Sequence, residues 1–171
     1  MIKTLPEDGM SGLKFIDDNV FHIEKSPIYT QLGEGVKSVE FVRSKGDKPL
    51  FVEARSSFPN PKNSDKEFRE QIADICDKFT HSLNLYPAVD VGVTESDFPR
   101  EYIPSDKVSL LFVLVINGFE KTWCDEVERA LLNKIRESIC MARIWKPEVC
   151  VLTYETAIKK KLTIESAPIS F

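Results

Sequence analysis

An almost unbroken apolar run over residues 108–116 constrains the fold of this chain more than any other feature. A strand with one face in water alternates polar and apolar side chains, whereas a wholly apolar strand is covered on both faces. The run is far shorter than the roughly 20 residues that a membrane-spanning helix needs. It therefore predicts a central strand in a sheet that is covered on both sides.

The remaining patterns place helices and further strands around this run. In chain order we expect a hairpin over 13–24, a short helix after Ser26-Pro27, strands over 38–43 and 50–57, a helix from Ser64 to Tyr86-Pro87, the strand over 108–116, a helix from Thr122 to Trp145, a strand over 149–152 and a helix over 156–161. Val89, Val91 and Val93 alternate and suggest a short edge strand. Strands that alternate with helices after a meander predict an α/β fold with a mixed central sheet flanked by helices.

Length, charge and cysteine usage narrow the class of protein. The 171 residues predict one domain over 1–171. The N-terminus lacks the apolar block of a secretory signal, and the four cysteines are scattered without a CxxC spacing, as small core residues would be. We therefore expect a cytoplasmic protein without a membrane partner. The net charge of −4 counts against non-specific binding of nucleic acid, although a local basic cleft stays compatible with it.

Two acidic residues and one cation form the candidate site. Glu40 lies in one predicted strand, and Glu53 and Arg55 lie in the next, after Leu50-Phe51-Val52. The segment between them is a turn sequence, so a hairpin brings the two carboxylates near each other. Such a group could hold a divalent metal against a phosphate. The same three residues could equally form a salt-bridged rim without chemistry.

At these residues the chain resembles the PD-(D/E)XK superfamily of nucleases, the restriction-endonuclease-like proteins. That family has a core of helix, three-strand meander, helix and strand, with one metal-binding acid on the second strand and a (D/E)-x-K signature on the third. Glu40 matches the first acid and Glu53 the second, while Arg55 stands in place of the lysine. Val39 precedes Glu40 where the family has proline before its acid. The resemblance covers a core of about residues 20–154.

The resemblance implies a restriction-endonuclease-like core and a metal-dependent nuclease of nucleic-acid processing or defence. Mg²⁺ or Mn²⁺ would be bound by Glu40, Glu53 and the carbonyl of Ala54, with Glu40, Glu53 and Arg55 as the catalytic residues. Arg55 can stabilise charge on a phosphate but is a poor general base because it stays protonated.

The partner would be DNA or RNA, and a homodimer is one assembly open to such a chain. The alternative is a catalytically silent α/β module that binds a protein partner.

Overall fold

The computed structural model describes residues 4–6, 14–16, 20–24, 26–45, 48–63, 65–90, 109–161 and 163–164. Its strands are β1 (Thr4–Pro6), β2 (Lys14–Ile16), β3 (Val20–Phe21), β4 (Phe41–Lys45), β5 (Lys48–Arg55), β6 (Leu111–Ile116), β7 (Glu148–Thr153) and β8 (Thr163–Ile164). Its α-helices are α1 (Pro27–Gln31), α2 (Asp65–Asp90), α3 (Lys121–Arg136) and α4 (Tyr154–Lys159), and a π-helical turn (Met141–Trp145) lies between α3 and β7.

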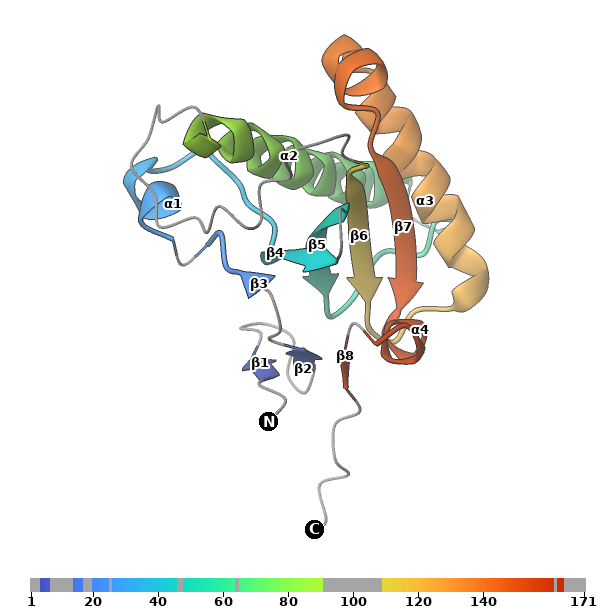
Figure 1. Ribbon diagram of the computed structural model, residues 1–171. Coiled ribbons are helices and arrows are strands. Elements are labelled where there is room, and N and C mark those ends of the chain that lie inside the picture. The colour runs from blue at the N-terminus through green and yellow to red at the C-terminus, as the bar shows by residue number, and fades with distance from the viewer. Residues whose placement is uncertain are drawn as a thin grey trace.

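The main sheet has its strands side by side in chain order, β3-β4-β5-β6-β7. The first three form an antiparallel meander, and β5, β6 and β7 are parallel to one another. A small antiparallel sheet, β1-β2-β8, lies beside the two chain ends in Figure 1. The predicted α/β class with a mixed sheet flanked by helices is confirmed. The apolar run over 108–116 supplies β6, an interior strand between β5 and β7, whereas the middle strand of the five is β5.

Helices α2 and α3 cover the same face of the sheet. Both parallel connections, β5-α2-β6 and β6-α3-β7, move in the same direction across the sheet, and connections of one handedness then place both helices on one side. Apolar residues of both helices accordingly share one core with the strands, and Figure 1 shows the two helices together behind the sheet. A second, smaller core on the opposite face includes Ala157 of α4.

Aromatic rings from three elements meet at the centre of the larger core. Phe112 of β6 stacks on Phe79 of α2, with ring centroids 4.4 Å apart and planes at 3°. Phe51 of β5 meets Phe112 edge-on at 5.6 Å. All three side chains are fully buried, so β5, β6 and α2 are held together by direct contact of large apolar groups.

Three local predictions are wrong. The hairpin over 13–24 does not form, because β2 pairs with β1 and β8 whereas β3 pairs with β4 in the other sheet. Helix α2 continues through Pro87 to Asp90, which places Val89 in a helix rather than an edge strand; Val91 and Val93 lie outside the described residues. Helix α3 begins at Lys121 with Glu120 as its N-cap, so Thr122 does not cap it.

Other local signals were interpreted correctly. Ser26 is the N-cap of α1, where its hydroxyl accepts a hydrogen bond from the Tyr29 amide, and Pro27 occupies the first turn. Cys76 and Cys124 are buried as expected, but Cys140 is exposed. No helix in the described part of the chain is long and apolar enough to span a membrane.

Strand β7 is the last strand of the main sheet in its described part, and α3 packs beside it. The amide of Val151 donates a hydrogen bond to the carboxylate of Glu128 on α3, at 3.1 Å. An edge strand normally leaves such donors to solvent. Here a side chain of the neighbouring helix satisfies one of them.

The first testable prediction concerns the aromatic centre of the core. Phe112→Ala should lower the free energy of unfolding by about 3–5 kcal/mol, because it removes a buried ring and leaves a cavity between Phe79 and Phe51. Ile144→Ala is the control and should change it by less than about 0.5 kcal/mol, because Ile144 is largely exposed. Urea denaturation measures both. A loss below about 1 kcal/mol for Phe112→Ala would contradict this account of the core.

Candidate functional site

The candidate site lies where β5 faces α2. Residues of a strand alternate between its two faces, so Phe51, Glu53 and Arg55 point to one side. Phe51 belongs to the helix-covered core, and therefore Glu53 and Arg55 also face the helices. Glu53 is fully buried there, with 0% of its surface exposed. A carboxyl group thus occupies a position at which apolar side chains are the rule.

Two cations contact one oxygen of the Glu53 carboxylate. Lys78 of α2 places its Nζ 2.8 Å from Glu53 Oε1, within hydrogen-bonding distance. Arg55 brings its Nε to 3.1 Å of the same oxygen, although the angle does not satisfy a hydrogen bond. The other oxygen, Glu53 Oε2, is buried and has no hydrogen-bond partner among the described residues. Only one of the two carboxylate oxygens, Oε1, therefore has a hydrogen-bond partner among the described residues.

Burial raises the pKa of Glu53 from 4.5 to about 7. Desolvation is the main cause, because a charged carboxylate loses its hydration in the core. The positive charges of Lys78 and Arg55 oppose the shift, and the negative charge of Glu40 adds to it. Glu53 can therefore gain or lose a proton near neutral pH.

Beyond Arg55 the ion pairs continue along the surface of α2. Arg55 Nη2 contacts Asp74 Oδ2, and Asp74 Oδ1 lies 3.0 Å from Lys37 Nζ. Lys37 also reaches Asp77 at 3.0 Å. Although partial burial opposes it, hydrogen bonding to Lys37 and Arg55 holds the pKa of Asp74 below its usual value. Positive and negative groups thus alternate from the buried Glu53 out to the exposed Asp77.

The segment before β4 is fixed to the same helix through its backbone. The Lys37 amide donates to His81 Nδ1 at 3.0 Å, and the Val39 amide donates to Ser82 Oγ at 2.9 Å. Asp74, Asp77, Lys78 and His81 recur at helical spacing and form one polar stripe on α2. Residues of this stripe contact Glu53 and Arg55 of β5, and His81 also accepts a hydrogen bond from the backbone just before β4.

Glu40 lies next to Glu53 at the point where the β4–β5 pairing ends. The last pair in the register is Phe41↔Val52, so the next positions along the two strands are Glu40 and Glu53. The charge of Glu40 contributes to the raised pKa of Glu53, which agrees with this proximity. Glu40 therefore lies near Glu53, but just before β4, which begins at Phe41, instead of within the strand predicted over 38–43.

The carbonyl of Ala54 also lies beyond the end of this ladder. Arg55 accepts a hydrogen bond from Asn117 on the β6 side, so alternation turns the Ala54 carbonyl toward β4. Continued pairing would oppose Ala54 to Val39, but the Val39 amide bonds Ser82 instead. The predicted third metal ligand thus lacks the ladder donor that a regular hairpin would give it.

These groups offer oxygen donors for a hard cation, but few of them. The unsatisfied Glu53 Oε2, the Glu40 carboxylate and the Ala54 carbonyl are the types of oxygen that Mg²⁺ takes as ligands. Within the described ranges, no group of three or more His, Cys, Asp or Glu side chains is placed to hold a metal ion. A cation here would have two carboxylates at most and would keep several of its waters.

Sequence reasoning found Glu40, Glu53 and Arg55 but missed Lys78, Asp74 and Lys37. The signal lay in α2, where polar residues at positions 74, 77, 78 and 81 flank the apolar stripe that faces the sheet. Charged residues next to the buried face of a helix are the ones that can reach a strand beneath it.

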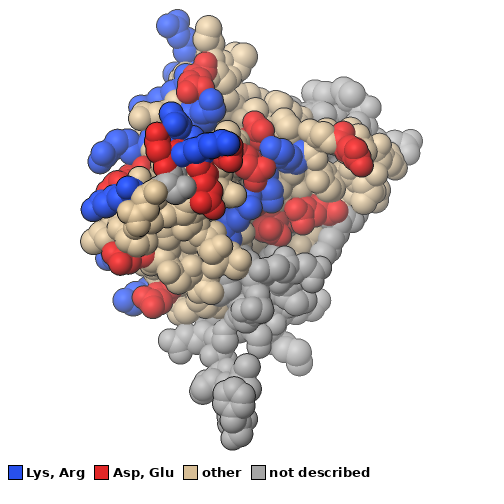
Figure 2. All heavy atoms as spheres, turned by 180° about the vertical axis from the view of Figure 1, so that it is seen from behind, with Lys and Arg blue, Asp and Glu red and all other residues tan. Residues whose placement is uncertain are grey.

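Surface charge around α2 and α3 is mixed. Figure 2 shows the face with these helices, where Lys and Arg side chains lie interspersed with Asp and Glu. Comparison of the chain with protein-family models, with curated proteins and with solved structures finds no match.

The second testable prediction follows from the pKa of Glu53. The folded state binds a proton at Glu53 up to about pH 7, whereas the unfolded chain releases it near pH 4.5, so this residue costs stability as pH rises through that window. Glu53→Gln should therefore become more stable relative to the wild type, by at least about 1 kcal/mol, between pH 4.5 and 7. Urea denaturation in metal-free buffer measures the difference. Glu70→Gln, at an exposed position of α2, should show none, and a pH-independent difference for Glu53→Gln would contradict the prediction.

Proposed function

We propose that this protein is a metal-dependent nuclease-like protein that hydrolyses phosphodiester bonds in nucleic-acid processing or defence. The observation that carries the proposal is the contact of Lys78 Nζ with Glu53 Oε1 at 2.8 Å. A lysine amine beside the second acid is what the sequence motif lacks at Arg55. Lys78 supplies it from α2 instead of from β5.

The strand order supports the same proposal. The antiparallel meander β3-β4-β5 is followed by α2 and then by β6, which is parallel to β5, while α1 lies between β3 and β4. The meander, helix and strand of a restriction-endonuclease-like core occur here in that order, but α1 follows the first strand of the meander instead of preceding it. In that core the two acids belong to neighbouring strands of the meander; here Glu53 lies in β5, and Glu40 immediately precedes β4.

The residues of the site have separate roles in this proposal. Glu40, Glu53 and the Ala54 carbonyl would hold Mg²⁺ or Mn²⁺, which lowers the pKa of a bound water and offsets charge on the phosphate. Arg55 would stabilise negative charge that develops on the phosphate oxygens. Lys78 would orient the attacking water, and a lysine amine can give up a proton whereas an arginine guanidinium cannot.

A catalytically silent module that binds a protein partner is the second candidate. The burial of Glu53 favours it, because two cations already neutralise this carboxylate within the fold. A buried ion pair of this kind can serve structure alone. The two candidates differ in whether Glu53 exchanges a cationic side chain for a metal ion.

The third testable prediction concerns metal binding. Millimolar Mn²⁺ or Mg²⁺ should raise the melting temperature, because a ligand that binds only the folded state stabilises it by mass action. For a chain of this size each kcal/mol corresponds to roughly 2–4 °C. Glu53→Gln and Glu40→Gln should abolish the rise, whereas Glu70→Gln should keep it. An unchanged wild-type melting temperature in Mn²⁺ would favour the silent module.

The fourth testable prediction concerns cleavage. Single- and double-stranded DNA and RNA are incubated with the protein in Mg²⁺ and in Mn²⁺. Lys78→Ala and Arg55→Ala should each lower the turnover rate by about two to three orders of magnitude, as loss of a comparable electrostatic group does. Arg55→Lys should keep or raise activity, because it restores the amine of the family motif.

Lys66→Ala is the matched control, since Lys66 lies on the same helix but is exposed and pairs with Glu70 instead of Glu53. It should retain full activity. Cleavage that persists in Glu53→Gln would indicate a contaminant. A wild type that cuts none of the four substrates would reject the nuclease and leave the silent module.

A further inference from the structure

A second surface lies at the opposite end of the parallel strands from Glu53. It is formed by the C-terminal turn of α3, the π-helical turn Met141–Trp145 and the entry to β7. β7 begins at Glu148, which pairs with Leu111, the first residue of β6. Glu53 and Arg55 pair with the last half of β6. The two regions therefore lie at opposite ends of the parallel strands, and the second surface is not part of the site around Glu53.

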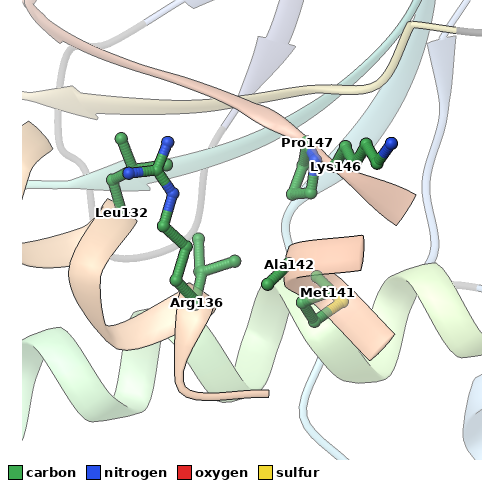
Figure 3. Close-up of a pocket in the computed structure, with 7 residues that line it drawn as sticks. Leu132, Arg136, Met141, Ala142, Lys146 and Pro147 are labelled. Atoms are coloured by element: carbon green, nitrogen blue, oxygen red, sulfur yellow. The ribbon is translucent and has the colours of Figure 1, made fainter. Parts of the chain in front are cut away.

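A pocket of about 230 Å³ opens at this end of the molecule. Its apolar walls come from Leu132 and Ile135 of α3, Met141 and Ala142 of the π-helical turn, and Pro147. Arg136 and Lys146 complete the lining, and Figure 3 shows them on two different sides of it. The pocket has room for one large apolar side chain, with cations beside it.

Two isoleucines within three residues of the pocket-lining Met141 are exposed to an unusual degree. Ile139 is 73% and Ile144 is 71% exposed, whereas the third exposed large apolar residue of the described chain, Leu32, is 40% exposed. Both flank Met141, which is buried. Exposed apolar side chains that gather with a pocket mark an interaction site more often than single ones do.

Three cations lie in the same segment of the chain as these isoleucines. Arg136, Arg143 and Lys146 are exposed, and none of them has an ion pair among the residues that the structure describes. Lys134, two residues before Arg136, is by contrast neutralised by Glu137 at 2.6 Å. The net charge of the whole protein is −4, so this concentration of unpaired positive charge runs against the overall balance.

The backbone beneath the surface has an uncommon conformation. The π-helical turn ends at Lys146, which adopts a left-handed conformation with φ 45° and ψ 51°. The Lys146 amide donates to the Met141 carbonyl at 2.8 Å and closes the turn. π-Helical turns and non-glycine residues with positive φ both carry a conformational cost, and both are frequent at functional sites.

The chemistry of the surface selects among classes of partner. Single-stranded nucleic acid is bound through aromatic platforms, but the exposed apolar groups here are aliphatic. A lipid surface would contact the isoleucines but would not fill a concave pocket. A protein segment with an apolar side chain and carboxylates satisfies the pocket, the isoleucines and the cations together.

We propose that the surface formed by Arg136, Ile139, Arg143, Ile144 and Lys146 docks an acidic segment of a partner protein, which inserts one apolar side chain into the adjacent pocket. The proposal concerns a binding function separate from phosphodiester hydrolysis and holds whether or not the chain cleaves nucleic acid. The carboxylates of the segment pair with the three cations. The isoleucines lose their contact with water on binding.

Selection of short random peptides on the immobilised full-length protein tests this directly. Enriched peptides should carry a leucine, isoleucine, phenylalanine or methionine next to aspartates or glutamates. Fluorescence anisotropy with these peptides should show that Arg136→Glu and Ile144→Ser each weaken binding by at least about tenfold. High salt should weaken it as well, because exposed charges are screened.

Arg129→Glu is the matched control, since Arg129 is an exposed cation of α3 outside the docking surface, and it should leave binding unchanged. Circular dichroism confirms that each variant is folded. The proposal is overturned if no peptide is enriched, or if the enriched peptides bind Arg136→Glu and Ile144→Ser like the wild type. It is also overturned if no peptide binds, but phosphatidylserine-containing vesicles or a DNA duplex bind the wild type and lose this binding in Arg136→Glu and Ile144→Ser.

Discussion

The burial of one carboxyl group on the helix-covered face of the sheet is the constraint on which much of the structure depends. A charge at this depth is costly unless cations meet it, and the cost is several kcal/mol for an isolated ion. Glu53 obtains its cations from Arg55 on its own strand and from Lys78 on α2. The contact with Lys78 fixes how far along β5 the helix lies, in a way that apolar packing alone would not.

The same helix then determines where the meander ends. The backbone amides of Lys37 and Val39 donate hydrogen bonds to His81 and Ser82 of α2. The segment before β4 is therefore bonded to the helix, and its pairing with β5 ends at Phe41 and Val52. A regular hairpin would have engaged Ala54 in a ladder. The irregularity that removes the ladder donor of the Ala54 carbonyl therefore involves side chains on a helix, because the Val39 amide bonds Ser82 instead.

The difference between contacts within the strands and contacts made by helix side chains explains what the sequence could predict. The apolar run over 108–116 and the spacing of elements predicted β6, the α/β class and the neighbouring positions of Glu40 and Glu53, because strand patterns depend on near neighbours in the chain. Lys78 could not be assigned, since its meeting with Glu53 depends on the rotation of α2. The hairpin over 13–24 failed for a related reason: short strands carry little signal about which sheet they join, and β2 and β3 join different ones. Pro87 suggested a helix end, yet α2 continues to Asp90.

The contact of Glu128 with the Val151 amide has a consequence for how molecules of this protein meet in solution. A strand from another chain that tried to lengthen the sheet at β7 would have to displace the Glu128 carboxylate and leave it without its donor. At the opposite side, β3 offers only two residues for pairing. Both borders of the described sheet thus resist strand addition, which protects a protein with so apolar an interior strand as β6 from templated aggregation.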